Sequence, residues 1–288
     1  MLNLRYPATD LGDPFALLST ALGTPLPVDM ERELRRLYRR YWLKAGTGCK
    51  MKKSTAFRVT YGKTIKTAYK TTYEGKPLHW VRAKLMAAAR NRCPSCGGPN
   101  PTELDHHLPQ KPFTEFALFP LNLIPMCGPC NKRKSASSET DINKAFVHPY
   151  LDTIPAVTFY NPTVTRSDGT YTVTFQFVPG AIADVVLAKR MAFQIKRIKL
   201  NNRLSSEVTE VLNEFALTIR DEIVELNGGV IDPATISVML LKRADRIEEL
   251  HRVGFWQAVM ARALASDATF CSGGFQDLLP RAPVPVGP

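Results

Sequence analysis

Two pairs of cysteines constrain this chain more than any other feature. Each pair has the spacing CxxC, formed by Cys93 with Cys96 and by Cys127 with Cys130, and the segment 97–126 separates the pairs. Four thiolates at this spacing are typical of a tetrahedral structural zinc site. Gly97, beside the first pair, provides the backbone freedom that a tight metal-binding turn requires. We therefore expect this part of the chain to close around a zinc ion.

The remaining cysteines and the composition indicate a globular protein of a reducing compartment. Of the six cysteines, Cys49 and Cys271 stand alone, which favours reduced thiols over a disulfide framework. The 288 residues, 44% of them hydrophobic, suffice for one large or two small domains. The N-terminus shows no signal-peptide pattern, and no window approaches the length of apolar sequence that a membrane-spanning helix needs. We expect a soluble, cytoplasmic protein that makes no contact with a membrane.

Positive charge is concentrated in one segment ahead of the cysteines. Residues 31–92 contain 18 lysines and arginines and three acidic residues, a net charge of +15, so the rest of the chain sums to −3 against a total of +12. Aromatic residues are interleaved with these cations: Phe57, Tyr61, Tyr69, Tyr73 and Trp80. A basic region of this kind is typical of nucleic-acid binding. The candidate contacts are Arg35, Arg36, Arg39, Arg40, Lys52 and Lys53; for the arginines, a solvated basic face on a core helix is the alternative.

Apolar spacing predicts the elements of the first half. Residues 29–44 form a helix with an N-cap at Asp29 and an apolar face of Leu34, Leu37, Tyr38, Tyr41 and Trp42. Residues 50–73 are rich in threonine, valine and tyrosine and are interpreted as a β-hairpin or a flexible basic arm. Residues 77–92 form an alanine-rich helix that leads into the first cysteine pair.

The second half is predicted to be a β-hairpin followed by helices. The strands cover residues 156–160 and 171–178, with a turn at 167–169. The helices cover residues 182–199, 207–226 with a cap at Ser206, 233–252 with a cap at Asp232, and 255–266.

The chain therefore divides into five regions. They are an irregular lead-in (residues 1–28), a basic nucleic-acid-binding region (29–92), the cysteine-containing module (93–152), the hairpin with its helices (153–268) and a flexible tail rich in proline and glycine (269–288). The expected fold class is α+β.

The residues between the cysteine pairs are more than a zinc ribbon needs. A triplet Leu104-Asp105-His106 precedes a proline-containing loop, the apolar run 122–126 begins with Asn122, and Asn131 follows the last cysteine ahead of basic residues. This order of D-H, N-L, CxxC and N resembles the HNH endonucleases, also called ββα-metal nucleases. The resemblance is confined to the cysteine-containing module, a minor part of the chain, and implies two strands and a helix around a catalytic divalent ion.

The resemblance also implies roles for individual residues. His106 matches the general base, and an imidazole can take a proton from water at neutral pH. Asp105 and Asn131 match the ligands of a catalytic divalent cation such as Mg²⁺, which prefers oxygen donors. Asn122 matches the residue that fixes the loop of the base. Lys132, Arg133 and Lys134 would neutralise the phosphate.

Two histidines of the module have alternative assignments. His107 is either a further ligand or a packing or surface residue, and His148, in the stretch HPYLD, is either a ligand or a structural cap. Glu103 is expected to be solvated. A similar HPYxD stretch occurs in a subset of bacterial HNH proteins, some of them in anti-phage or mobile-element systems with an ATPase partner. By analogy, an ATPase or another defence subunit, or a second copy of the chain, is a candidate partner.

The leading hypothesis is thus an HNH endonuclease that acts on DNA. Two alternatives stay open: a zinc-containing nucleic-acid-binding module without catalysis that recruits a partner protein, and an HNH ribonuclease.

Overall fold

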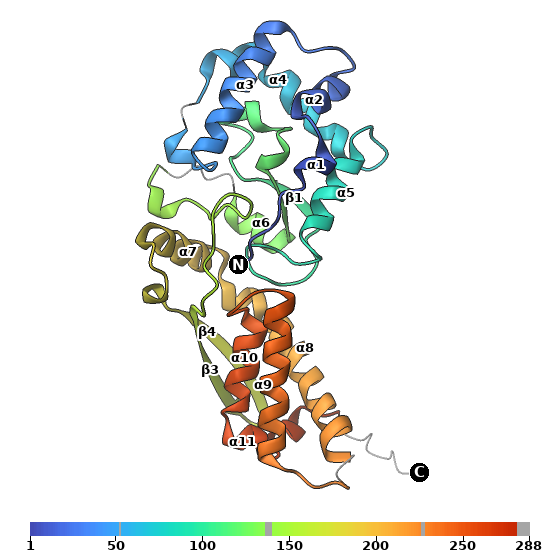
Figure 1. The fold of residues 1–288 in the computed structure, drawn as a ribbon, viewed down its shortest axis with the longest axis vertical. Helices are drawn as coiled ribbons and strands as arrows, with labels where there is room; N and C mark the ends of the chain where they lie inside the picture. Colours follow the sequence, from blue (N-terminus) through green and yellow to red (C-terminus); the bar gives the residue numbers. More distant parts are fainter. Residues whose placement is uncertain (52, 136–139, 226–227, 281–288) are drawn as a thin grey trace. The chain divides into compact units, whose positions relative to one another are not determined.

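The computed structural model describes residues 1–51, 53–135, 140–225 and 228–280. The chain forms two compact units, one of Met1–Pro155 with Ile182–Leu200 and one of Ala156–Ala181 with Asn201–Pro288 (Figure 1). The predicted division after residue 152 is therefore close to the first boundary, but residues 182–200 return to the first unit. Within the described residues, no helix is both long enough and apolar enough to cross a membrane.

The first unit contains seven α-helices and one two-stranded sheet among the described residues. The helices are α1 (Ala8–Leu11), α2 (Pro14–Leu22), α3 (Val28–Leu43), α4 (Thr55–Ala68), α5 (His79–Ala88), α6 (Gly128–Lys134) and α7 (Val185–Ile198), and the strands are β1 (Glu103–His106) and β2 (Leu123–Met126). Five single turns of 3-10 helix connect them: η1 (Gly48–Lys50), η2 (Tyr69–Thr72), η3 (Thr114–Phe116), η4 (Pro120–Asn122) and η5 (Ile142–Lys144).

Helix α3 confirms the amphipathic pattern of residues 29–44. Leu34, Leu37, Tyr38 and Tyr41 are at most 6% exposed, and they face the core of the unit. Two details of the predicted helix were wrong. Trp42 is 58% exposed, because it lies at the edge of the buried stripe, and Asp29 belongs to the first turn rather than to the N-cap.

The described residues of the segment 50–73 form neither a hairpin nor a flexible arm. Thr55–Ala68 are the helix α4, followed by the 3-10 turn η2. Phe57, Tyr61, Ile65 and Ala68 recur at helical spacing, and three of them are buried. The β-branched residues that suggested strands lie between them, and packing of this apolar stripe outweighs their weak local preference.

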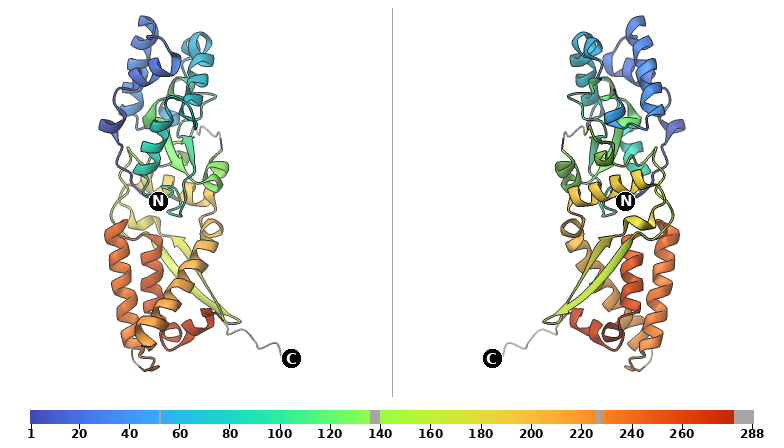
Figure 2. Two further views of the ribbon diagram at one scale, coloured as in Figure 1. Left: turned by 90° about the vertical axis from the view of Figure 1, so that its right-hand side faces the viewer. Right: turned by 90° about the vertical axis from the view of Figure 1, so that its left-hand side faces the viewer.

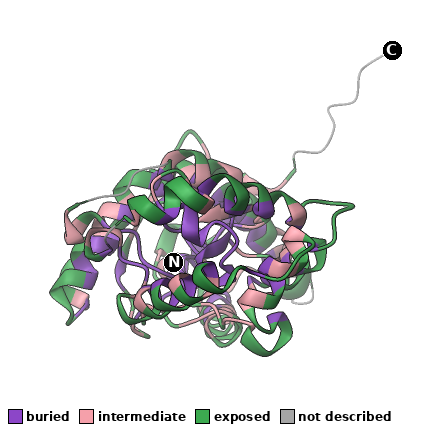
Figure 3. Ribbon diagram, turned by 90° about the horizontal axis from the view of Figure 1, so that it is seen from above, coloured by how far each residue is buried: buried purple, intermediate pink, exposed green. Residues whose placement is uncertain are grey.

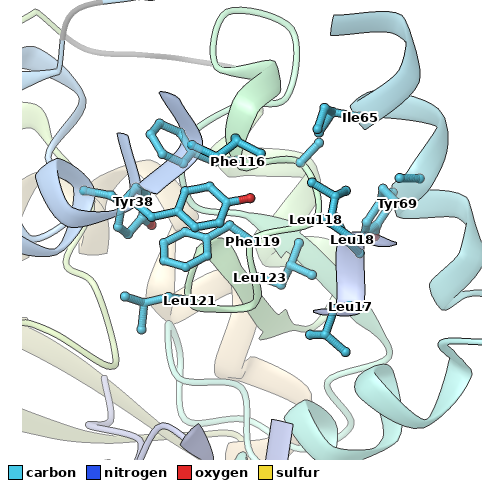
Figure 4. Packing of buried hydrophobic residues seen from close by; sticks show 14 of the residues in the cluster. Leu17, Leu18, Tyr38, Ile65, Tyr69, Phe116, Leu118, Phe119, Leu121 and Leu123 are labelled. Atoms are coloured by element: carbon cyan, nitrogen blue, oxygen red, sulfur yellow. The ribbon is translucent and has the colours of Figure 1, made fainter. Parts of the chain in front are cut away.

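The core of the first unit is aromatic. Tyr38 stacks on Phe119 with ring centroids 3.9 Å apart, and Phe116 packs against both rings (Figure 4). Leu17 and Leu18 of α2 and Ile65 of α4 belong to the same cluster. In Figure 3, buried purple segments alternate with exposed green segments along the helices, as amphipathic helices require. This cluster joins the basic N-terminal helices to the segment between the cysteine pairs.

The second unit combines a β-hairpin with helices. Its elements are β3 (Tyr160–Ser167), β4 (Thr170–Phe177), η6 (Pro179–Ala181), α8 (Leu200–Ile219), the π-helical turn η7 (Arg220–Glu225), α9 (Pro233–Leu250), α10 (Trp256–Ala265), α11 (Ala268–Cys271) and η8 (Gly274–Leu278). Helix α10 packs against α9 and β3 (Figure 2). Asp168 and Gly169 both have positive φ, as a two-residue hairpin turn requires.

Several boundaries of the second unit differ from the prediction. Strand β3 starts at Tyr160 and contains Pro162, which a two-stranded hairpin tolerates because each strand has a free edge. Helix α8 starts at Leu200 directly after Lys199, which has a left-handed backbone, so Ser206 lies inside the helix and caps nothing. Asp232 caps α9 through its contacts with Ala234 N and Thr235 N, as predicted.

The predicted flexible tail was wrong for residues 269–280. Phe270 and Phe275 are at most 1% exposed, and Tyr171 of β4 contacts the Phe270 ring edge-on. The aromatic residues of this segment bury enough apolar area to hold it despite its glycines. The predicted tail residues 281–288 lie outside the described part of the chain.

Candidate active site and metal centre

The four cysteines of the two CxxC pairs meet in one buried cluster. Their Sγ atoms all lie within 4.8 Å of one another, and 3.9 Å separates Cys96 from Cys127. Zinc–sulfur bonds of about 2.3 Å place the sulfurs of a tetrahedral site about 3.8 Å apart. Cys93, Cys96, Cys127 and Cys130 are each at most 2% exposed and form no disulfide. The donor set and its geometry fit a structural metal ion such as zinc.

Each pair is held by the backbone around it. In the first, Gly97 has φ +76° and Gly98 N–H donates to Cys96 Sγ at 3.3 Å. In the second, Cys127 precedes α6 and Cys130 lies in its first turn, with the amide of Asn131 donating to the Cys127 carbonyl. The second pair therefore fixes the start of α6.

Strands β1 and β2 place the acidic residues opposite α6. The strands pair antiparallel, with Asp105 opposite Ile124 and His106 opposite Leu123. Because side chains alternate along a strand, Glu103 and Asp105 share one face. Helix α6 follows β2 directly and contacts β1. Two antiparallel strands followed by one helix is also the order that the resemblance to HNH nucleases implies for the cysteine-containing module.

Two polar contacts join β1 to α6. Asn131 Nδ2 donates to Glu103 Oε2, and Lys134 Nζ lies 2.8 Å from Asp105 Oδ2. Asn131 and Lys134 are three residues apart, which puts both on one side of the helix. Glu103 was expected to be solvated, but it is half-buried and orients Asn131.

Lys134 is not available to a phosphate, contrary to the prediction. It is 2% exposed, donates to the His106 carbonyl at 2.8 Å and pairs with Asp105. Arg133 is half-buried and donates to the carbonyl of Ile198 at the end of α7. Of the three basic residues predicted to bind phosphate, Lys132 alone has no contact of this kind among the described residues. The helical register turns the other two inward.

One ring nitrogen of His106 forms a hydrogen bond that fixes the ring. Its Nε2 lies 2.9 Å from the carbonyl oxygen of Ala117, an acceptor, so Nε2 carries the proton in the neutral ring. Its Nδ1 then carries a lone pair and has no hydrogen-bond partner among the described residues. Burial lowers the pKa of His106 below 6.5, so the ring is neutral at pH 7. This is the protonation state that a general base needs.

Asn122 fixes the loop that carries the Ala117 carbonyl. The side chain is fully buried; its Oδ1 accepts from Leu108 N at 2.7 Å, and its Nδ2 donates to the carbonyls of Leu108 and Phe116. Its own carbonyl accepts from His107 N at 2.8 Å. These contacts join η4, directly before β2, to Leu108 and Phe116 near the two ends of the loop.

A buried hydrogen-bond chain orients Asn122 in turn. Tyr41 of α3 donates its hydroxyl to Asn122 Oδ1 at 2.9 Å and lies 3.0 Å from His148 Nε2. His148 Nδ1 accepts from the amide of Tyr150, so Nε2 carries the proton and donates to Tyr41. Burial lowers the pKa of His148 to about 3, so this ring is neutral. Sequence reasoning missed Tyr41, although its place on the buried stripe of an otherwise basic helix was visible.

His107 and His148 are packing residues of this network. Their rings lie 4.3 Å apart, and both are at most 8% exposed. Burial lowers the pKa of His107 well below 6.5, which removes the cost of placing two histidine rings together. Of the two roles considered for His148, the structural cap fits its position behind Asn122.

The HPYLD segment is fixed to α7 by an ion pair. Arg190 contacts both carboxylate oxygens of Asp152 at 2.6 and 2.8 Å and donates to the carbonyls of Ala145 and Phe146. Asp152 Oδ2 also accepts from the amide of His148. A bidentate pair of this kind fixes orientation as well as distance. Helix α7 therefore supports the module directly, in addition to belonging to the first unit.

Two oxygen donors remain for a catalytic cation. Asp105 Oδ1 and Asn131 Oδ1 have no hydrogen-bond partner among the described residues, because Lys134 and Glu103 engage the other atoms of these groups. Oxygen donors suit Mg²⁺, which keeps several waters and binds few protein ligands. Across the described residues, the thiolate cluster is the only group of three or more His, Cys, Asp or Glu side chains placed to share an ion.

The basic residues of α3 and α4 differ in their partners. Arg35 and Arg36 pair with Glu31 and Glu33 of their own helix, and Arg35 also lies over the ring of Phe15. Arg39 and Lys53 are exposed, Arg40 is half-buried, and Lys52 lies outside the described residues. On α4 and η2, four cations are exposed and form no ion pair within the described chain: Arg58, Lys63, Lys66 and Lys70.

Comparisons with known proteins give one relative. The chain is 25% identical over 217 residues to Protein ea31 of Escherichia phage lambda. The match covers 69% of this chain and 70% of that protein. No family model and no solved structure matches the chain.

Proposed function

We propose that this protein is a metal-dependent endonuclease of the HNH type that hydrolyses phosphodiester bonds in DNA. The observation that carries the proposal is the state of His106. Its Nε2 donates to the Ala117 carbonyl, its Nδ1 has no partner among the described residues, and Asp105 is its neighbour on β1. A neutral histidine with one fixed and one free nitrogen is built to accept a proton.

The proton chemistry follows from this geometry. His106 Nδ1 accepts a proton from a water molecule as the water oxygen forms a bond to phosphorus, and the bond from phosphorus to the 3′ oxygen breaks. The leaving oxygen takes a proton from solvent, and the imidazolium returns its proton to solvent. Ala117 fixes the tautomer of the ring, and Asn122 fixes the loop of Ala117, so neither residue needs to contact the substrate.

A divalent cation bound by Asp105 and Asn131 would supply charge neutralisation at the phosphate and at the leaving oxygen. The chain prepares the two ligands in advance. Glu103 holds the amide of Asn131, and Lys134 holds Asp105 and the carbonyl of His106. Preorganised ligands of this kind reduce the reorganisation that binding requires.

Helix α4 and turn η2 are the surface proposed to bring the phosphate backbone to this site. Three of their exposed cations, Lys63, Lys66 and Lys70, lack ion-pair partners in the described structure, whereas those of α3 at positions 35 and 36 are already paired. Turn η2 also reaches the base, because the Tyr69 ring lies 4.5 Å from the ring of His106. Unpaired cations near a catalytic base favour binding of the polyanion there.

Cleavage of supercoiled plasmid by the purified full chain tests the proposal. With added Mg²⁺, wild-type protein is expected to nick the plasmid, and His106→Ala is expected to lose about 10²- to 10⁴-fold in rate, the typical contribution of a general base. His79→Ala, at an exposed histidine of α5, is the matched control and is expected to keep the wild-type rate. Zinc content measured for each variant establishes that the thiolate cluster is intact.

The outcomes separate the alternatives. Wild-type cleavage by His106→Ala overturns the role of His106. Binding of DNA without nicking under any divalent ion favours the non-catalytic zinc module. Cleavage of RNA in preference to DNA under the same conditions assigns the protein as an HNH ribonuclease.

A further inference from the structure

An aromatic path runs from the proposed base to the surface of the first unit. The ring of Tyr69 meets the ring of His106 with centroids 4.5 Å apart, and the ring of Tyr73 meets that of Tyr69 edge-on at 5.6 Å. The Tyr73 and His106 centroids can therefore be no farther apart than the sum of these two separations. Adjacent nucleotides of a duplex strand are about 3.4 Å apart along the axis. Tyr73 is thus within a few nucleotides of the bond that His106 would attack.

The inner ring of this path is fixed and the outer ring is open. Tyr69 is 9% exposed, and its hydroxyl donates to the Leu104 carbonyl of β1 at 2.9 Å. Tyr73 is 45% exposed. The exposed ring is thus held in place by a neighbour that is itself anchored to the catalytic strand.

One cation, Arg82, lies against the open ring of Tyr73, and a second, Lys70, is three positions away in the sequence. The guanidinium of Arg82 lies 5.6 Å from the Tyr73 centroid and 3.5 Å from the Tyr69 hydroxyl. Lys70, between the two tyrosines in sequence, is exposed. Neither Arg82 nor Lys70 forms an ion pair with a carboxylate of the described residues, and residues 34–73 contain no acidic residue at all. Glu74 follows Tyr73 and is exposed, but it forms no ion pair with Arg82 or Lys70, so both cations remain available to an anion beside the ring.

An exposed aromatic ring beside unpaired cations is the combination by which proteins hold single-stranded nucleic acid. The ring stacks on a base, and the cations bind the neighbouring phosphates. A base inside a duplex has both faces covered by its neighbours, so Tyr73 can stack only on a base that is unpaired and unstacked. We propose that Tyr73, with Arg82 and Lys70, binds an unpaired nucleotide next to the phosphate presented to His106. The substrate class is then a single strand, or a junction with an unpaired nucleotide, of DNA or RNA.

This inference rests on the proposed function for the identity of the reaction, but binding can be measured without cleavage. Fluorescence anisotropy with labelled oligonucleotides and the full chain, with no added divalent ion, gives the Kd for a single strand and for a duplex of the same sequence. The variants are Tyr73→Leu, which removes the ring, and Tyr73→Trp, which keeps an aromatic surface. Trp42→Leu, at an exposed aromatic residue of α3, is the matched control.

The expected result is a selective loss. Stacking of one base is worth about 1–3 kcal/mol, so Tyr73→Leu should weaken single-strand binding about 5- to 150-fold. Duplex binding should change less than about twofold, and Tyr73→Trp should restore single-strand binding. Equal losses of affinity for the single strand and the duplex, or no loss for either, would overturn the proposal. Thermal denaturation of each variant verifies that the first unit is folded. Parallel DNA and RNA single strands identify which of the two is bound more tightly.

The two hypotheses fail separately. Selective loss of single-strand binding together with unimpaired cleavage by His106→Ala would keep the nucleotide site and reject the proposed reaction. Loss of cleavage by His106→Ala together with unchanged or non-selective binding by Tyr73→Leu would keep the proposed reaction and reject the nucleotide site.

Discussion

The thiolate cluster and the polar residues of β1 and α6 differ in how many of their donor atoms already have a partner. In the cluster every donor is buried and faces the other three, so the coordination shell is complete without a substrate. At β1 and α6, Asp105, His106 and Asn131 each keep one side-chain atom without a hydrogen-bond partner in the described residues, with His106 on the opposite face of β1 from Asp105. A closed donor set suits a structural ion, and an open one suits chemistry. The difference fits a structural ion at the thiolate cluster and agrees with the catalytic role proposed for the residues of β1 and α6.

The two basic helices, α3 and α4, also differ in whether their charged groups already have partners. Helix α3 pairs Arg35 and Arg36 with its own glutamates and turns Tyr41 inward to Asn122. Helix α4 presents Lys63 and Lys66 without partners in the described structure. Positive charge in a sequence therefore does not identify a nucleic-acid surface until its pairing is known, because a paired guanidinium has less to gain from a phosphate.

Loss of a cysteine from the thiolate cluster should reduce the stability of the first unit more than any other change. Cys127→Ser removes one of the four thiolates, and structural zinc contributes about 10–16 kcal/mol to the folding of small zinc domains. We expect zinc content to fall and the first unit to lose its cooperative unfolding transition. Metal analysis and thermal denaturation measure both. Cys49→Ser, outside the cluster, should leave both unchanged, and a stable Cys127→Ser protein without metal would contradict the structural role.

Breaking the buried ion pair should come next. Lys134→Met leaves the carboxylate of Asp105, whose side chain is only 13% exposed, without its cation. Removing one partner of a buried pair costs about 3–5 kcal/mol. Lys132→Met, two positions away and without such a partner in the described chain, should change the free energy of unfolding by less than about 0.5 kcal/mol. Urea denaturation compares the two variants, and equal effects would show that Lys134 is solvated after all.

Removing the Tyr41 hydroxyl should have a smaller effect. Tyr41→Phe leaves Asn122 Oδ1 with one donor fewer and His148 Nε2 without its acceptor. Leaving buried polar atoms unsatisfied costs about 1–3 kcal/mol. Tyr61→Phe on α4, where the hydroxyl makes no hydrogen bond within the described residues, is the control. Indistinguishable denaturation midpoints for the two variants would remove Tyr41 from the network.

The smallest effect on stability is expected on α4 and η2. Replacing Lys63, Lys66 and Lys70 by glutamine should leave unfolding unchanged, since all three are exposed. Each lost phosphate contact lowers the slope of log Kd against log salt by about 0.9 for duplex DNA, or about 2.7 for three contacts. The corresponding change for Arg35→Gln with Arg36→Gln should be smaller because these residues are paired. Salt titrations of DNA binding distinguish the helices, and a larger change for α3 would reverse the assignment.

The sequence predicted the site better than the surroundings of the site. The cysteine spacing identified the cluster, because ligand spacing is a local property. Asp105 lies in β1, Asn122 lies at the end of η4 directly before β2, and Asn131 lies in α6, as the order of strands and helix places them. The roles of Tyr41 and Arg190 could not be predicted, since each acts through a contact with a residue far away in the chain. Lys134 was misassigned because the register of a short helix, and not residue type, decides which side chains are buried.

The most direct test of the central claim is the single-turnover cleavage rate of His106→Gly with and without added imidazole. If His106 is the general base, the variant should lose about 10²- to 10⁴-fold in rate, and free imidazole should restore part of that loss by occupying the vacated position. Asp105→Asn, which keeps the histidine, should gain nothing from imidazole. Cleavage by His106→Gly at the wild-type rate in the absence of imidazole would contradict the account.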